Sequence, residues 1–492
     1  MHHLKKLLEK CDQLYINGHW LKGEGEKRVL SNPANEEFLT EIHEASVEQV
    51  ELAIQAAFDA FRTNDWAINK GKRIETLKRI AQRLEDAKDD LTKLEVINTG
   101  KPYNEAKLDI DDSIACLRYY VDLIVEKQPR RIKMEDGSVS KVHKEPIGVC
   151  SLIVPWNFPF LLGMWKIAPA LAAGNTIVFK PSEITPLSSI LFTELLDQCD
   201  VPDGVFNLVL GAGKGPGEAL VTSDKVDKVS FTGGSETGRK VIELCAQSFK
   251  RVSLELGGKS PFLIFDDVDA DLAAELAIYG AFLNQGEVCV ASSRLLVHEN
   301  LYETFLGKLN EKLQKLRIGD PFDENTEMGA IISKEHLAKI ERYISIGKEE
   351  GATLLFGGER LNRKGLFITP AVFTNVKQNM RIVQEEIFGP VVTVQSFRTE
   401  KEAIELANDT KFGLAAGILS GNQERAQKIA GELKAGMIWI NSYHTPYVEA
   451  PWGGYKQSGI GRELGPEGLD GFLETKHVNT QKSVESLGWY KF

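Results

Sequence analysis

Two residues in the second half of the chain have the chemistry of a nucleophile and a general base. Cys289 stands in the segment NQGEVCVASSR, and Glu255 stands 34 residues earlier in RVSLELGG. We expect Cys289 to lie at the start of a helix after a glycine-containing turn, where the helix end lowers the pKa of a thiol and exposes its sulfur. We expect Glu255 to end an apolar strand, where burial raises the pKa of a carboxyl toward neutrality. Each residue alone is also typical of a protein core, as a packed thiol or a satisfied carboxylate.

Asn157 adds a hydrogen-bond donor to this chemistry. It follows the apolar segment GVCSLIV in VPWNFP, and a side-chain amide there can stabilise a carbonyl oxygen as negative charge develops on it. The other cysteines, at positions 11, 116, 150, 199 and 245, have neither CxxC pairs nor the spacing of a metal site. We therefore expect reduced thiols, no metal centre and no disulfide framework, which is typical of a cytoplasmic protein.

Polar residues and glycines follow three successive predicted strands. Ligands of open α/β sheets bind at the carboxyl ends of the strands, so these positions predict a cofactor cleft. A lysine and a carboxylate can bind ribose hydroxyls, and glycines at a helix start let a pyrophosphate approach the backbone. The GxGxxG fingerprint does not occur in its usual strand–helix context, and any single glycine here could be a simple turn. The predicted cleft residues are Lys180, Ser182 and Glu183 after NTIVF, Gly213 after FNLVL, and Thr232, Gly233 and Gly234 after KVSF.

The order of apolar and helical segments predicts an α/β fold. From residue 148 onward, GVCSLIV, NTIVFKP, FNLVLG, KVSFTG and RVSLELGG are separated by enough chain for crossover helices. We expect these strands to form a parallel sheet with helices on both faces. Residues 46–128 have apolar residues at three- and four-residue steps and predict a helical lead-in, and a second α/β unit is expected over 260–463.

Two further segments, 127–142 and 475–484, alternate polar and apolar residues around turn signals. Neither can bury a face by itself. We expect extended arms that pair with each other or with another subunit, which makes a homodimer or homotetramer the expected assembly.

Composition excludes several classes of protein. A chain of 492 residues with 42% hydrophobic and 26% charged residues is typical of a multidomain globular protein. The net charge of −11 disfavours nucleic acid and anionic membranes as partners. Residues 146–165 are uncharged over a length that could span a membrane, but three prolines and an amide favour a buried strand that leads into a loop. The N-terminal segment lacks the apolar core of a secretory signal, so we expect no export.

Seven ordered segments resemble motifs of the NAD(P)-dependent aldehyde dehydrogenases. They are VPWNFP, FKPSEITP, SFTGGSETG, SLELGGKSP, NQGEVCVASSR, QEEIFGPVV and APWGGYKQSGIGRE. The resemblance covers nearly the whole chain and implies an aldehyde dehydrogenase-like α/β fold, with a Rossmann-type parallel-sheet cofactor domain, a second α/β catalytic domain and an extended β oligomerisation arm. The implied boundaries are 1–124 and 147–257 for the dinucleotide-binding domain, 258–464 for the catalytic domain, and 125–146 and 465–492 for the arm.

The same resemblance implies catalytic roles. Cys289 would add to the aldehyde carbonyl, and Asn157 with the Cys289 backbone N–H would stabilise the thiohemiacetal oxyanion. Glu255 would activate the water that hydrolyses the thioester to a carboxylic acid. Lys166 and Glu463 match a charge relay of some members, although a lysine in that helical segment is also typical of a plain ion pair.

The resemblance also implies that the chain binds NAD or NADP. Glu386 and Phe388 match contacts near the nicotinamide, and Lys180 and Glu183 match ribose contacts on the adenosine side. A glutamate at position 183 repels a 2′-phosphate and favours NAD, while an extra lysine in the cleft, Lys214, leaves NADP open. The other residues implied to line the cleft are Val154, Pro155, Trp156, Ser182, Gly213, Phe231, Thr232, Gly233, Gly234, Leu256 and Gly257.

Among the subfamilies, the sequence looks most like the betaine aldehyde dehydrogenases, which enclose a trimethylammonium group with aromatic faces. Trp165 and Trp452 match two rings of that box. Phe158 stands where tyrosine is common, Leu283 stands where an aromatic residue is common, and Glu449 could attract a cation. We expect a betaine-aldehyde-like enzyme or one with broad specificity for apolar aldehydes.

Two alternatives remain on the same fold. A coenzyme A-acylating semialdehyde dehydrogenase would pass the thioester to a thiol, but that class commonly lacks the base at Glu255. A binding or structural protein, as some eye-lens crystallins are, would have no need of Cys289, Glu255 and Asn157.

Overall fold

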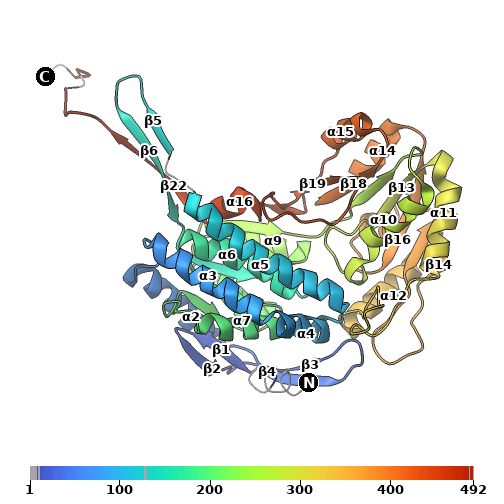
Figure 1. The fold of residues 1–492 in the computed structure, drawn as a ribbon, viewed down its shortest axis with the longest axis horizontal. Coiled ribbons are helices and arrows are strands. Elements are labelled where there is room, and N and C mark those ends of the chain that lie inside the picture. Colours follow the sequence, from blue (N-terminus) through green and yellow to red (C-terminus); the bar gives the residue numbers. More distant parts are fainter. Residues whose placement is uncertain (1–7, 9–11, 127–129, 487, 491–492) are drawn as a thin grey trace.

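The computed structural model describes residue 8 and residues 12–126, 130–486 and 488–490. Two large sheets make up the body, and a smaller three-stranded sheet projects from it as an arm (Figure 1). Cys11 and residues 127–129 of the expected arm lie outside the described residues. The α/β class expected from the sequence is therefore the observed one.

The first sheet has eight strands, in the order β2-β1-β9-β8-β7-β10-β11-β21. Its five central strands, β9 to β11 in that order, run parallel, whereas β1 and β21 are antiparallel to their neighbours. The parallel strands are the predicted ones. Burial on both faces explains the mostly apolar sequences of β7 and β8. The bounds are β1 Gln13–Ile16, β2 His19–Lys22, β7 Val149–Ile153, β8 Thr176–Lys180, β9 Phe206–Leu208, β10 Lys228–Thr232, β11 Arg251–Glu255 and β21 Gly459–Ile460.

Helices pack on both faces of this sheet. Right-handed crossovers place α6 and α7 on one face and α8 and α9 on the other, and α2 packs against β7, β8 and β9. Helix α2 starts with a capping box in which Ser46 and Gln49 satisfy each other's backbone N–H groups. The bounds are α2 Val47–Thr63, α3 Lys70–Asp86, α4 Lys88–Thr99, α5 Tyr103–Glu126, α6 Pro159–Ala173, α7 Leu187–Asp197, η1 Gly213–Gly217, α8 Glu218–Thr222 and α9 Ser235–Ala246.

The second sheet has seven strands, in the order β14-β15-β16-β13-β12-β18-β19. All but the edge strand β14 run parallel. The strands are β12 Pro261–Ile264, β13 Arg294–His298, β14 Thr353–Gly357, β15 Ala371–Thr374, β16 Val391–Phe397, β18 Ala415–Leu419 and β19 Met437–Ile440. The helices and turns of this unit are α10 Ala270–Phe282, η2 Leu283–Gly286, α11 Glu299–Leu313, α12 Lys334–Glu349, α13 Arg381–Gln384, α14 Glu400–Asn408 and α15 Gln423–Glu432.

The arm consists of β5 Arg130–Lys133, β6 Val139–Pro146 and β22 Leu473–Thr480. Strand β22 pairs with β6 over eight residues, from Leu473 opposite Pro146 to Thr480 opposite Val139. The two arm segments thus pair within one chain, one of the two expected arrangements. The short elements that remain are the hairpin of β3 Lys27–Ser31 and β4 Phe38–His43, the pair of β17 Phe412–Gly413 and β20 Tyr455–Lys456, and helix α16 Gly465–Asp470.

The uncharged stretch 146–165 was expected to be a buried strand that leads into a loop, but it also contains the start of a helix. It contains β7, a short loop and then the start of α6, where Pro159 takes the first helical position because its missing N–H costs nothing there. All fifteen residues of α6 are buried, which explains the apolar run without a bilayer. None of the helices in the described part of the chain is long and apolar enough to cross a membrane.

Candidate active site

Glu255 is the last residue of β11, the position expected for it. Its register partners are Thr232 at the end of β10 and Gly459 in β21. The side chain is 5% exposed, and neither carboxylate oxygen has a hydrogen-bond partner in the described structure. Burial raises the pKa of this carboxyl well above its ordinary value, and Glu463 raises it further. A protonatable group in such surroundings is suited to exchanging a proton near neutral pH.

Cys289 does not begin a helix, so that expectation was wrong. It lies in a turn between η2 and β13, because the chain leaves α10 through left-handed residues and then enters a strand. With no helix end to lower it, the pKa of the thiol is raised by burial and by the carboxylates of Glu255 and Glu386. Cys289 is nevertheless the one partly exposed cysteine among those described, since Cys116, Cys150, Cys199 and Cys245 are buried.

Asn157 brings its amide to the Cys289 loop. Its Nδ2 donates a hydrogen bond of 2.9 Å to the carbonyl oxygen of Glu287, two residues before Cys289. Its Oδ1 is buried without a partner in the described structure. One of the two Nδ2 hydrogens is thus used to attach Asn157 to the loop, and the second can bind a reacting oxygen.

Lys166 and Glu463 meet behind Glu255. The Lys166 ammonium of α6 contacts Glu463 Oε1, and both side chains are buried. Glu463 reaches this position because it exchanges two backbone hydrogen bonds with Trp452, of 2.7 and 2.8 Å. Besides burial, which raises the pKa of Glu255 most, the charge of Glu463 raises this pKa and that of Lys166 lowers it.

The strand ends of the first sheet form a cradle for an elongated anionic group. Helix α9 begins at Ser235, directly after the predicted glycines, and Ser235 Oγ and Thr232 Oγ1 have no hydrogen-bond partner in the described structure. A Cβ at Gly213 or Gly234 would meet no atom within 4 Å, so open space lies beside both glycines. These features fit a pyrophosphate, which binds backbone N–H groups at a helix start.

A buried lysine lies at the end of the predicted cleft where ribose contacts were expected. Lys180 Nζ donates to the carbonyl oxygens of Gly211, at 2.6 Å, and Pro181, at 3.1 Å. Glu183 and Ser182 follow on the loop after β8. The remaining predicted cleft residues also lie at strand ends, with Val154 and Pro155 after β7, Phe231 in β10, and Leu256 and Gly257 after β11.

The other end of the cleft is built from the second domain. Glu386 Oε1 accepts a hydrogen bond of 3.0 Å from Gly258 N, and a Cβ at Gly257 would lie 2.1 Å from the Glu386 carboxylate. Phe388 has a left-handed φ of 64° and meets Trp156 edge to face, with ring centroids 5.2 Å apart. A hollow of about 310 Å³ opens between Trp156, Ile184, His336 and Lys339, which is wide enough to admit part of a dinucleotide.

Aromatic rings line the predicted substrate side. Trp165 and Trp452 are both buried and pack edge to face, with centroids 5.0 Å apart. Phe158 is partly buried, and the Lys101 ammonium lies 4.0 Å from its ring centroid. Leu283 is partly buried at the start of η2, whereas Glu449 is exposed on the surface.

Several residues around the site were not predicted. Trp439 lies 6.0 Å from Trp452, ring to ring, and His336 lies 5.1 Å from Trp156. Lys101 and Asn284 contact Phe158 and Asn157 respectively. The apolar segment GMIWIN, which forms β19, could have suggested Trp439. Nothing in the local sequence marks the others, since they are brought to the site by chain folding alone.

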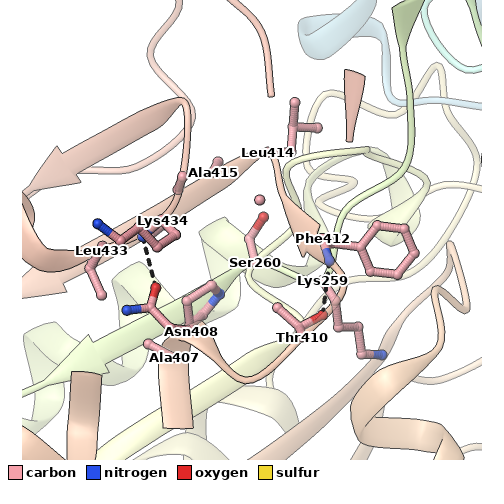
Figure 2. Close-up of a pocket in the computed structure, with 14 residues that line it drawn as sticks. Lys259, Ser260, Ala407, Asn408, Thr410, Phe412, Leu414, Ala415, Leu433 and Lys434 are labelled. Atoms are coloured by element: carbon pink, nitrogen blue, oxygen red, sulfur yellow. Dashed lines mark hydrogen bonds between the residues drawn. The ribbon is translucent and has the colours of Figure 1, made fainter. Parts of the chain in front are cut away.

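A small cavity lies behind the segment that follows Glu255. Figure 2 shows its lining, which includes Lys259, Ser260, Asn408, Thr410 and Lys434. Burial and the charge of Arg294 lower the pKa of Lys259 to about 7, and its Nζ has no partner in the described structure. The cavity volume is about 10 Å³, which is room for one water molecule and not for a substrate.

Comparisons with known proteins agree with this geometry. The model of the aldehyde dehydrogenase family matches residues 20–478. A betaine aldehyde dehydrogenase of Bacillus subtilis (strain 168) is 44% identical over 484 residues, which cover 97% of this chain and 99% of that protein. A peroxisomal aminoaldehyde dehydrogenase of Pisum sativum is 44% identical over 491 residues, with 97% of each chain covered.

A solved structure is also similar. The crystal structure of a betaine aldehyde dehydrogenase from Staphylococcus aureus in complex with NAD⁺ matches with a TM-score of 0.96 and 43% identity, over 100% of this chain and 99% of that chain. Another structure of that enzyme carries a cysteine modified by BME.

Proposed function

Because this chain belongs to the aldehyde dehydrogenase family, we propose that it oxidises an aldehyde to a carboxylic acid, with Cys289 as nucleophile and NAD⁺ as electron acceptor. The observation that carries this proposal is the pairing of Cys289, a partly exposed residue, with a buried carboxylate that has no hydrogen-bond partner in the described structure. The Glu255 charge acts on the Cys289 thiol, and Glu255 has free oxygens for a water molecule. A bound NAD⁺, as in the S. aureus relative, supplies the hydride acceptor.

Residues of this chain can perform every step of the reaction except the acceptance of the hydride. The Cys289 thiolate adds to the aldehyde carbon, and the carbonyl oxygen becomes an oxyanion held by the second Asn157 Nδ2 hydrogen and the Cys289 N–H. Loss of hydride leaves an acyl thioester on Cys289. Glu255 then takes a proton from water, the hydroxide attacks the thioester carbon, and the Cys289 thiolate leaves with the carboxylic acid released.

The Lys166–Glu463 pair gives the Glu255 proton a neighbouring acceptor. Glu463 lies next to Glu255 in the same buried space, and Lys166 holds its carboxylate. We propose that the pair sets the pKa of Glu255 and does not touch the aldehyde itself.

The cofactor site is proposed at the strand ends of the first sheet. Ser235, Thr232, Gly213 and Gly234 would hold the pyrophosphate, and Lys180 with Glu183 would hold the adenosine ribose. Glu386 and Phe388 would hold the nicotinamide half. A glutamate at position 183 favours NAD⁺ over NADP⁺ by repelling a 2′-phosphate, and the ratio of kcat/KM for the two cofactors tests it.

We propose that the substrate is an aldehyde of the betaine aldehyde type. We expect this site to select for the trimethylammonium cation less strongly than a complete aromatic box would. Trp165 and Trp452 supply two rings, but Leu283 supplies none. The sharpest test compares betaine aldehyde with 3,3-dimethylbutanal, its uncharged isostere. Each ring contact contributes about 0.5–2 kcal/mol, so Leu283→Trp should raise the kcat/KM ratio of charged to neutral substrate by about 2- to 30-fold. An unchanged ratio would show that the side chain at 283 does not face the trimethylammonium group.

We propose that the domain boundaries and the oligomerisation arm are those that the sequence predicts. The chain crosses from the first sheet to the second between β11, which ends at Glu255, and β12, which starts at Pro261, in keeping with a boundary at 257/258. The exposed strands β5 and β22 project from the body (Figure 1), and open strand edges favour pairing with another subunit. Light scattering after size exclusion tests for a homodimer or homotetramer.

A test of the function as a whole measures NADH formation and product identity. The expected product is a carboxylic acid formed in the absence of coenzyme A. Acyl-CoA formation would favour the acylating alternative, and Cys289→Ala with undiminished turnover would remove the nucleophile assignment.

A further inference from the structure

Three consecutive residues before Cys289 adopt the left-handed conformation. Their φ angles are 47° at Asn284, 58° at Gln285 and 71° at Gly286. Such φ values are unfavourable for residues with a Cβ, and asparagine tolerates them better than most. At Gly286 a Cβ would lie 2.6 Å from the backbone of Gly389, so glycine is required there. A turn of this kind persists only where surrounding contacts hold it.

Contacts from distant parts of the chain hold the turn. Glu105 of α5 accepts a hydrogen bond of 2.9 Å from Asn284 N through its Oε2. Gln285 Oε1 accepts one of 3.0 Å from Gly329 N. Glu287 N closes the turn by donating 2.8 Å to the Asn284 carbonyl oxygen. The backbone leading to Cys289 is thus fixed from α5 on one side and from Gly329 on the other.

The Asn284 side chain faces the proposed oxyanion donor. Its Nδ2 donates to the carbonyl oxygen of Asn157 at 3.1 Å and to that of Glu287 at 3.3 Å. The Glu287 oxygen also accepts from Asn157 Nδ2 at 2.9 Å. Asn284 itself is 2% exposed. One buried amide therefore joins the backbone of Asn157 to the loop of Cys289, and both amides share the same acceptor.

From this geometry we propose that Asn284 is a positioning residue, which sets the Asn157 amide against Cys289 and is itself held by Glu105. The inference rests on the proposed oxyanion role of Asn157. Asn284 fits the task for two reasons: its backbone accepts the left-handed conformation, and its Nδ2 has two hydrogens for two carbonyl oxygens. The substitution Asn284→Asp would keep the shape of the side chain but would place an acceptor where both oxygens need a donor.

The test is a double-mutant cycle between Asn284 and Asn157. Asn157→Ala removes an oxyanion donor and should lower kcat by about 10²- to 10³-fold. Asn284→Asp should lower kcat by about 10- to 100-fold, because small displacements of reacting groups have effects of that size. If Asn284 acts through Asn157, the double variant should lie within about threefold of Asn157→Ala. The KM for NAD⁺ should change little in all three variants, since Asn284 and Asn157 hydrogen-bond in the described structure with Glu105, with Glu287 and with each other, and not with the residues proposed to hold the pyrophosphate.

Asn175→Asp is the matched control. Asn175 is also fully buried, and its Nδ2 likewise donates to two backbone carbonyl oxygens, those of Ala170 and Phe472, far from the Cys289 loop. This variant should lose thermal stability as Asn284→Asp does, without the loss of kcat. An equal loss of kcat in both variants would show that the effect at Asn284 is general destabilisation and would overturn the proposal.

A second pair of variants tests the anchor even if Asn284→Asp fails to fold. Glu105→Gln keeps an oxygen acceptor for Asn284 N, whereas Glu105→Ala removes it. The expected loss of kcat is smaller for Glu105→Gln than for Glu105→Ala. Equal losses would overturn the anchoring role, and multiplicative effects of Asn284→Asp and Asn157→Ala would overturn the positioning role. If Asn157→Ala is fully active, the proposed oxyanion role is what fails.

Discussion

Replacing Glu255 by glutamine isolates the proposed hydrolytic step. The amide has the shape of the carboxyl group, and since neither Glu255 oxygen has a protein partner, the substitution breaks no hydrogen bond in the described structure. General-base catalysis contributes about 10²- to 10⁴-fold, so steady turnover should fall by that factor. Formation of the thioester does not need the base that activates water, and it should still proceed once per active site.

The assay is rapid mixing of Glu255→Gln with aldehyde and NAD⁺, followed by NADH absorbance and mass spectrometry of the quenched protein. The expected record is a burst of about one NADH per active site, a slow steady phase, and a Cys289 peptide carrying the acyl group. Steady turnover at the wild-type rate would refute Glu255 as the base. Absence of both burst and acyl adduct would show that Glu255 is needed before the thioester forms.

The space around Glu255 permits an independent perturbation that keeps the carboxyl group but changes its position. A Cβ at Gly453 would lie 2.7 Å from Glu255 Oε1, and Gly453 has a φ of 154°, which disfavours any side chain. Gly453→Ala should therefore displace the carboxylate and slow the steady phase more than the burst. Gly431→Ala is the matched control, because Gly431 lies in α15 with no atom within 4 Å of the added Cβ, and it should leave both phases intact.

The charges and the exposure of the site lead to three further predictions. Iodoacetamide should modify Cys289 before the four described buried cysteines; peptide mapping that finds uniform slow labelling would contradict the nucleophile assignment. The pKa values of Cys289, which would form the thioester, and of Glu255, which would activate the water that hydrolyses it, are both raised, and their deprotonated forms are the reactive ones. We therefore expect kcat to increase with pH from about 6 to 9, and a kcat that is flat over this range would count against these two roles. Lys166→Met leaves Glu463 buried without its cation, which should lower the free energy of unfolding by about 3–5 kcal/mol. Because Lys166 lowers the pKa of Glu255, the same variant should move the rise of kcat to higher pH. Denaturant titration and the pH profile of kcat measure the two effects, and a variant as stable as the parent would show that the ion pair is dispensable.

Much of the cofactor domain could be predicted from the sequence because parallel strands bury both faces. The runs that became β7 and β8 are mostly apolar, β10 and β11 carry apolar residues between polar ones, and the ends of all four could be located from the polar and glycine residues that follow. The positions of Glu255 and Lys180 at strand ends could therefore be predicted without knowledge of the tertiary structure.

The surroundings of Cys289 could not be predicted in the same way. A glycine-containing turn before a cysteine suggested a helix start, but the turn is left-handed and leads into β13. The pKa of its thiol is therefore governed by burial and by Glu255 and Glu386, which come from segments 34 residues before and 97 residues after it. Local patterns carry no information about such neighbours.

By itself, the sequence determined which residue types were available at the strand ends, the α/β class and the ordered motifs of the family. The tertiary structure alone decided which of them meet. It returns β21 to the side of Glu255, places the Lys101 ammonium on the Phe158 ring and joins Asn284 to Asn157. These contacts link residues that are far apart along the chain, and they form because packing two domains leaves each buried polar group only the partners that chain folding brings within hydrogen-bond distance.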